Sequence, residues 1–178
     1  METQLQNQFN KLENQRFQLI EFIKSFSDLE QNRIPSPGKW SMNQILLHLI
    51  LAEEISVKSV KAKIITSQNI EKAAWMNPIR VFLLRVFLRS SKKFKAPKAV
   101  SDLPQKLEFT ELAERWSVAR KNLNDLLESL PEKLLNKSIF KHPVAGKLSI
   151  YGGLSFIEEH VRRHQKQIHQ LTNPNEKL

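Results

Sequence analysis

Apolar side chains recur every three or four positions along four long segments of the chain, at about residues 5–26, 41–65, 112–130 and 149–172. This spacing is the period of an amphipathic α-helix, which buries one stripe of its surface against a neighbour. No segment shows a convincing alternation of apolar and polar positions, which a half-buried β-strand would require. The pattern therefore predicts an all-α protein.

Local signals mark the ends of these helices. Pro35-Ser36-Pro37-Gly38 interrupts the chain after the first helix, and Pro131 closes the third. Ser41 and Gln44 have the spacing of a capping box, in which each side chain bonds the backbone N–H of the other residue. The second helix is thus predicted to begin at Ser41, which places His48 two turns into it.

Four amphipathic helices of this length bury their stripes most simply as an antiparallel four-helix bundle. The second and third helices are connected by about 45 residues, whereas connections in bundles usually have about 2–8. We therefore expect a long crossover that carries a short extra helix at residues 79–88, after Asn77-Pro78. The 178 residues are predicted to form a single domain, 1–178, with a disordered tail at 173–178.

Cysteine is absent from the sequence, which excludes disulfides, thiolate metal ligands and a cysteine nucleophile. Any sulfur chemistry would therefore require a thiol from another molecule. The polar start of the chain lacks the basic and apolar regions of a secretory signal, and no apolar stretch approaches the roughly 20 residues of a membrane span. These features lead us to expect a cytoplasmic protein.

The formal net charge is +10, and the surplus is concentrated between Arg80 and Lys98, where no acid occurs. The seven basic residues of this stretch are Arg80, Arg85, Arg89, Lys92, Lys93, Lys95 and Lys98. Such a patch attracts anions, including an anionic cosubstrate, without specifying one. No RNP-like aromatic motif, zinc-finger spacing or clear helix-turn-helix pattern accompanies it, so nucleic acid is not the expected partner.

Three histidines are the candidate metal ligands. His48 lies in an apolar run of the second helix, and His160 and His164 follow about 110 residues later at the i, i+4 spacing of one helix face. Burying unpaired polar groups costs several kcal/mol, and a shared metal removes that cost for all three rings. Three protein ligands also leave an open coordination position, as reactive metal sites do. The alternative is that each is an ordinary core or surface histidine.

The remaining polar residues near these positions are weaker candidates for metal ligands or catalytic groups. His169 lies about 180° from His160 around the helix and is expected to face outward, and His142 lies in the predicted loop before the fourth helix. Glu158 and Glu159 precede the first histidine of the pair, so this segment lacks the H-E-x-x-H order of zinc proteases.

Three blocks of the sequence, two of which contain the candidate ligands, occur in a distinctive order. They are Pro37-Gly38-Lys39-Trp40-Ser41-Met42-Asn43-Gln44-Ile45-Leu46-Leu47-His48-Leu49, Phe140-Lys141-His142-Pro143-Val144-Ala145-Gly146-Lys147-Leu148-Ser149, and His160-x-x-x-His164-x-x-Gln167-Ile168. Together they resemble the DinB-like superfamily of metal-dependent four-helix-bundle proteins, which includes bacterial low-molecular-weight-thiol S-transferases. The resemblance covers about residues 37–171.

This resemblance implies that His48, His160 and His164 are the metal ligands, and that Trp40 is the aromatic residue that opens the family's second helix. The implied metal is zinc or nickel, with water completing the coordination shell. The family contains transferases and hydrolases beside members of unknown activity. The resemblance therefore implies a metal-dependent protein without settling its reaction.

The leading hypothesis is a transferase whose metal binds an external thiol, because a metal stabilises the nucleophilic thiolate. A hydrolase would instead use metal-bound water, whose pKa falls to about 7 at a three-histidine zinc centre. Glu158 or Glu159 could then serve as a base, or could simply be solvated surface. Both versions act on a small-molecule substrate.

The contrasting hypothesis is a non-enzymatic binding protein with a structural or vestigial metal site. In that protein the apolar and basic residues 79–98 would dock a partner or a membrane surface, with Arg85, Arg89 and Lys92 on one face. Ile79 and the other apolar residues of this stretch could equally pack on the bundle or on a second copy. A homodimer through the crossover or a bundle face is compatible with either hypothesis.

Overall fold

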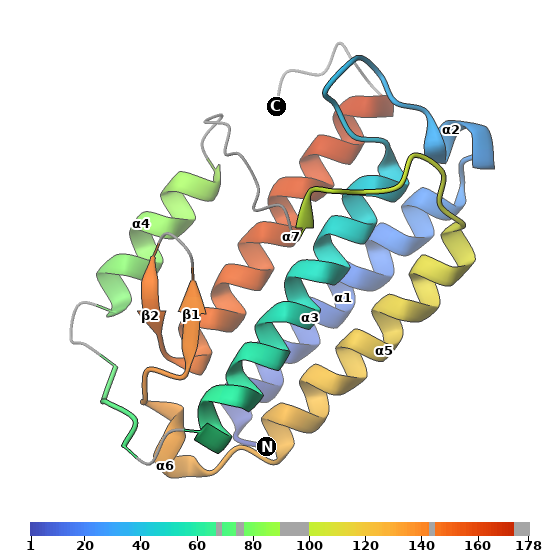
Figure 1. Ribbon diagram of the computed structural model, residues 1–178. Coiled ribbons are helices and arrows are strands. Elements are labelled where there is room, and N and C mark those ends of the chain that lie inside the picture. The colour runs from blue at the N-terminus through green and yellow to red at the C-terminus, as the bar shows by residue number, and fades with distance from the viewer. Residues whose placement is uncertain (67–68, 74–76, 90–99, 143–144, 173–178) are drawn as a thin grey trace.

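The computed structural model describes residues 1–66, 69–73, 77–89, 100–142 and 145–172. Within these residues the protein is a helical bundle with a small β-hairpin and one extra helix on one side (Figure 1). The all-α prediction is confirmed for the architecture as a whole. The tail predicted to be disordered, 173–178, and the four lysines of the basic stretch lie outside the described residues.

The long helices of the bundle are α1 (Thr3–Lys24), α3 (Met42–Thr66), α5 (Phe109–Glu128) and α7 (Ile150–Thr172). The short helices α2 (Asp28–Asn32) and α6 (Glu132–Leu135) lie in the connections. The helix predicted in the crossover is α4 (Asn77–Arg89), which packs beside α7. No helix in the described part of the chain combines the length and apolar character needed to cross a bilayer.

The helices α3 and α5 run parallel, as side-chain contacts along their length show. Near their starts Asn43 Nδ2 donates to the Leu107 carbonyl at 2.9 Å, and farther along Arg115 Nη2 lies 2.7 Å from Glu54 Oε2. The crossover at 67–108 causes this arrangement, because it returns the chain to the end at which α3 begins (Figure 1). The antiparallel arrangement expected for the bundle therefore does not hold for this pair, although the long crossover predicted between these helices is present.

The helices α1 and α7 are also parallel neighbours. Gln8 Nε2 donates to the Tyr151 carbonyl and Gln15 Nε2 to the Glu158 carbonyl, each at 3.4 Å. The other two neighbouring pairs, α1 with α5 and α3 with α7, run antiparallel (Figure 1). The bundle thus consists of two parallel pairs that pack against each other in opposite directions.

A hairpin of β1 (Phe140–His142) and β2 (Gly146–Leu148) precedes α7. The hydrophobic pattern predicts no sheet here and places His142 in a loop, and both expectations are wrong. Strands of three residues are too short for an alternating pattern to be distinguished. Gly146 has φ 74°, which glycine adopts without the steric cost of a Cβ. Because Phe140 and Leu148 are buried, the hairpin extends the core beyond the bundle.

The first turn of α3 is held by the predicted capping box. The Gln44 backbone N–H donates to Ser41 Oγ at 3.2 Å, and the Ser41 N–H donates to Gln44 Oε1 at 3.0 Å. Gln44 Nε2 also donates to the Pro104 carbonyl at 2.9 Å. These bonds attach the start of α3 to the end of the crossover and thereby position His48.

A buried ionic network joins α1, α3 and α5. Arg120, 1% exposed, lies with Nη2 at 3.1 Å from Glu53 Oε2, and the Trp116 Nε1–H donates to the same oxygen at 3.2 Å. Glu13 adds a second carboxylate 3.2 Å from Arg120 Nε. Burial raises the pKa of Glu53, and the charge of Arg120 opposes this shift. Removing one partner of a buried pair commonly costs about 3–5 kcal/mol, so the network ties three helices together.

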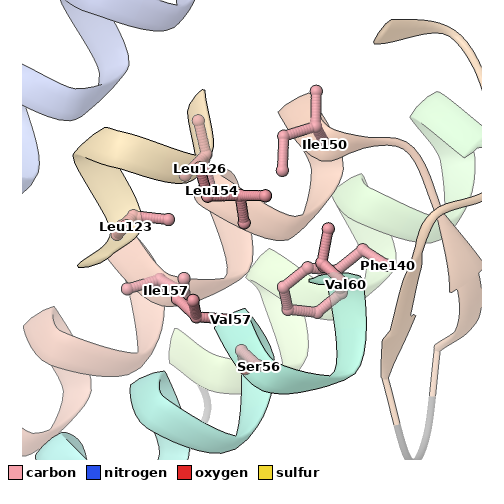
Figure 2. Close-up of a pocket in the computed structure, with 9 residues that line it drawn as sticks. All are labelled: Ser56, Val57, Val60, Leu123, Leu126, Phe140, Ile150, Leu154 and Ile157. Carbon is pink, nitrogen blue, oxygen red and sulfur yellow. The ribbon is translucent and has the colours of Figure 1, made fainter. Parts of the chain in front are cut away.

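A small apolar pocket lies where α3, α5, α7 and β1 meet (Figure 2). The residues that line it are Ser56, Val57, Val60, Leu123, Leu126, Phe140, Ile150, Leu154 and Ile157. Its volume of about 10 Å³ accommodates at most one water molecule. This pocket is therefore a gap in the packing and has no room for a substrate.

Gly153→Ala is expected to destabilise the protein, although alanine is the better helix former. A Cβ at residue 153 would lie within 2.8 Å of ring carbons of the buried Phe140. Overpacking of this kind costs about 1–3 kcal/mol, which exceeds the helix-propensity gain of up to about 1 kcal/mol. Urea denaturation should show a lower midpoint for the variant.

The matched background is Phe140→Ala, which removes all three ring carbons that a Cβ on Gly153 would meet, whereas leucine would keep a Cγ at the same place. In that background the Gly153→Ala change should be neutral or stabilising, because only the helix-propensity gain remains. An equal loss of stability in both backgrounds would mean that contact with Phe140 is not the cause.

Candidate metal centre

Three histidines from two helices meet at the contact between α3 and α7. His48 lies in the second turn of α3, and His160 and His164 come from one face of α7. Their candidate ligand nitrogens all lie within 4.8 Å of one another. His48 and His164 are 5% and 8% exposed, and His160 is half-buried. These three side chains, the histidine cluster, are the ones that the sequence spacing singles out.

Hydrogen bonds determine the tautomers of two rings in the cluster. His48 Nδ1 lies 2.8 Å from the Val100 carbonyl oxygen, and His164 Nδ1 lies 3.0 Å from Gln167 Oε1. Because both oxygens can only accept, each Nδ1 carries the proton and each Nε2 presents a lone pair. Metal-binding histidines are oriented in this way, with the second nitrogen donating to a nearby oxygen.

The Nε2 atoms of His48 and His160 lie 3.1 Å apart. Since His48 Nε2 is unprotonated, either a proton on His160 or a shared cation must lie between them, because two lone pairs repel. Two nitrogens bound to one zinc ion at about 2.0–2.1 Å in tetrahedral geometry are about 3.3 Å apart. The observed separation therefore fits a shared divalent metal.

Burial keeps the clustered rings neutral at pH 7. It lowers the pKa of His164 to about 3, with repulsion from His48 adding to the shift and the bond to Gln167 opposing it. Burial, and then the neighbouring His164 and His48, lower the pKa of His160 well below its ordinary value. Burial also lowers the pKa of His48, and the bond to Val100 opposes that shift. Neutral imidazole is the form that binds metals.

Aromatic rings border the histidine cluster on two sides. The ring centroid of Trp40, just before α3, lies 4.9 Å from that of His48. Phe156 of α7 stacks on His160 with centroids 5.2 Å apart and an interplanar angle of 18°. The same Phe156 ring meets His142 of β1 edge-on at 4.2 Å. The hairpin is thus connected to the cluster through Phe156.

His142 is a buried part of these surroundings that the sequence did not indicate as functional. It is 7% exposed, and its Nδ1 accepts a hydrogen bond from the Ala145 N–H at 2.9 Å. Burial lowers its pKa to about 4, so the ring is neutral with the proton on Nε2. Two other groups accept hydrogen bonds from rings of the cluster. Gln167 is part of the third sequence block, whereas the Val100 carbonyl is marked by no sequence motif.

Glu158 and Glu159, the candidate bases, are both held in ion pairs beside His160. The Glu159 side chain is 3% exposed, with Arg89 Nε donating to Oε2 at 2.9 Å and Arg162 Nη1 lying 2.8 Å from Oε1. The bond from Arg89 lowers the pKa of Glu159, although burial opposes it. Glu158 pairs with Arg162 at 2.9 Å. A lowered pKa makes Glu159 a weak proton acceptor.

His169 lies outside the histidine cluster, on the side of α7 that α1 covers. Its ring centroid is 4.2 Å from that of Phe22, and the side chain is half-buried. The predicted outward orientation is therefore wrong, because α1 packs along that side of the helix. His169 nevertheless provides a matched histidine on the same helix for mutational comparison.

A family sequence model described as the DinB superfamily matches residues 11–168 of the chain. This span contains most of the bundle, the hairpin and all three clustered histidines. The chain belongs to the DinB superfamily. The resemblance indicated by the three sequence blocks is thereby confirmed for the family. This DinB protein is 26% identical to "Uncharacterized protein YuaE" of Bacillus subtilis (strain 168) over 149 residues, 84% of this chain and 87% of that protein.

The metal-free DinB protein is expected to lose stability as pH falls from about 6.5 toward 5, the range that begins at the ordinary histidine pKa. Burial lowers the pKa of His142 to about 4 and that of His164 to about 3 in the folded state. In this window the unfolded chain binds more protons, so acid favours unfolding by up to about 1.4 kcal/mol per pH unit and histidine. Thermal melts followed by circular dichroism should show a falling Tm.

The lowered pKa of Glu159 gives a contribution that is lost only at more acidic pH, whereas the raised pKa of Glu53 adds stability as pH falls and so opposes the histidines. The melts are therefore compared in a Glu53→Gln background, where this opposing group is absent and the window reports on the histidines. A Tm that stays constant across the window would contradict the burial of neutral rings in the metal-free protein.

Proposed function

We propose that this DinB protein is a metal-dependent enzyme that uses His48, His160 and His164 to hold zinc or nickel and transfers a low-molecular-weight thiol to an electrophilic substrate. The observation that supports it most directly is the pair of Nδ1–H bonds to Val100 and Gln167. These bonds leave the Nε2 lone pairs of two neutral rings directed into one cluster. Histidines that only fill a core do not need to direct their Nε2 lone pairs into one cluster.

A divalent metal bound there supplies an open coordination position and lowers the pKa of a thiol or water that occupies it. The chain has no cysteine, so the thiol must come from a cosubstrate. Burial excludes water from His48 and His164 and keeps them unprotonated. Trp40 adds an apolar wall beside the cluster. An anionic thiol would also be attracted by the positive charge of the protein.

Thiol transfer is favoured over hydrolysis by the state of the nearby carboxylates. A hydrolytic mechanism benefits from a general base with a pKa near the working pH. The bond from Arg89 instead lowers the pKa of Glu159, and Glu158 is paired with Arg162. A metal held by the three histidines would lower the pKa of a bound thiol so that its proton could pass to solvent without a carboxylate base, and the transferase therefore agrees better with these contacts.

His48→Ala, His160→Ala and His164→Ala are each expected to lose bound metal while they keep their helical content. The apolar core is expected to hold the fold in these variants, because buried residues on all four long helices contribute to it. Loss of a supporting residue typically weakens metal affinity about 10–100-fold, so loss of a ligand should weaken it at least as much. Elemental analysis after reconstitution with zinc or nickel measures the effect.

His169→Ala is the control, because that side chain sits on the same helix but packs against Phe22. It should retain metal at the level of the unmodified protein. Equal metal loss in this variant, or full metal content in the three cluster variants, would contradict the assignment of ligands.

The open coordination position is tested by substituting cobalt and adding a small thiol. A centre with three protein nitrogens should then give a sulfur-to-cobalt charge-transfer band that strengthens as pH rises and thiol becomes thiolate. The corresponding enzymatic test is thiol-dependent turnover of a panel of electrophiles. Both signals should disappear in His48→Ala.

A cobalt spectrum indifferent to thiol, azide and pH would indicate a saturated structural metal and would support the non-enzymatic alternative. Thiol binding without turnover of any electrophile would leave the metal centre in place and contradict the transferase.

A further inference from the structure

The helix α4 exposes an apolar face to solvent, opposite to the usual orientation of an amphipathic helix. Ile79, Phe82, Leu83 and Val86 are 45%, 63%, 59% and 52% exposed. Their i, i+3, i+4, i+7 spacing places them on one side of the helix. The single fully buried apolar side chain among the described residues of α4 is Leu84, at 5% exposure. We call the four exposed side chains the α4 apolar face.

Polar contacts with α7 fix the orientation of this helix. Arg85 Nε donates to Ser155 Oγ at 3.2 Å, and Arg89 Nε donates to Glu159 Oε2 at 2.9 Å. Arg163 Nη1 of α7 donates to the Leu88 carbonyl at 2.9 Å. Rotating α4 to bury its apolar face would break these bonds. The apolar face is therefore held in its exposed orientation, on a helix that itself lies at the outside of the bundle (Figure 1).

The charge around the α4 apolar face distinguishes between its candidate occupants. The sequence has seven basic residues and no acid between Arg80 and Lys98, and the whole chain carries a net charge of +10. A symmetric dimer through this face would place the same positive patch opposite itself. Four side chains are also a small part of the roughly 20–30 residues per side of a standard protein interface. An anionic surface has neither disadvantage.

We propose that α4 docks this protein on an anionic lipid bilayer. The apolar face would enter the boundary between headgroups and acyl chains, with Arg80 at the level of the lipid phosphates, while Arg85 and Arg89 keep their contacts with α7. Exposed apolar side chains combined with basic residues are the features of interfacial helices. The basic residues add electrostatic attraction that salt screens. This docking does not depend on the proposed thiol transferase.

The test is sedimentation of the full chain with vesicles of phosphatidylglycerol and phosphatidylcholine, compared with vesicles of phosphatidylcholine alone. The protein should bind the anionic vesicles, more weakly at high salt, and should not bind the zwitterionic ones. Phe82→Gln/Leu83→Gln should reduce binding on the order of tenfold or more, because two inserting side chains are lost. Glutamine keeps a high helix propensity, and circular dichroism should show unchanged helical content.

The matched control is Phe17→Gln/Val118→Gln, which changes two apolar residues of similar exposure, 62% and 60%, on α1 and α5. It should bind vesicles like the unmodified protein. Absence of binding to anionic vesicles at low salt, or equal binding by both double variants, would overturn the proposal. So would a Phe82→Gln/Leu83→Gln variant that changes from dimer to monomer in light scattering without a change in vesicle binding, since a second copy would then be the occupant.

Discussion

The packing of α3 against α7 is constrained by the need to pair the nitrogens of three clustered imidazoles, two of which are buried. Buried polar groups in proteins are almost always hydrogen-bonded. His48 meets this requirement through the Val100 carbonyl, which becomes available only when the crossover returns to the start of α3, and His164 meets it through Gln167 on its own helix. The Nε2 atom of His48 is left facing that of His160, 3.1 Å away. The cluster thus couples the fold of the crossover to the chemistry of the centre.

The helix α3 carries two polar networks of different character on two of its sides. Glu53 follows His48 by five residues, which is about 140° around the helix, and it faces α5 while the histidine faces α7. Opposite charges compensate burial at Glu53 and Arg120, whereas burial itself keeps the histidines neutral. Because the rings are neutral and the charges of Glu53 and Arg120 offset each other, the bundle buries these polar groups without leaving an isolated charge.

The sequence was most informative where a local pattern decides the structure. Helix period, the capping box at Ser41 and the i, i+4 pair of histidines each depend on residues within one or two turns, and they located the long helices and the cluster. The parallel course of α3 and α5 depends instead on a return path of about 40 residues between them, which no local pattern encodes. The hairpin strands are too short to show a period. The Val100 carbonyl is a backbone group, so no side-chain type in the sequence predicts its contact with His48.

The pairing of α1 with α7 has a consequence for the order in which the chain acquires its structure. The first helix packs along the last one, so contacts such as that of Phe22 with His169 join residues almost 150 positions apart. Contacts between such distant residues slow folding, because a long loop must close before they contribute. During synthesis on a ribosome, α1 would emerge long before its partner exists. The part of its apolar stripe that α7 covers would then stay exposed until the final helix leaves the exit tunnel, the period in which an incomplete chain is most prone to aggregate.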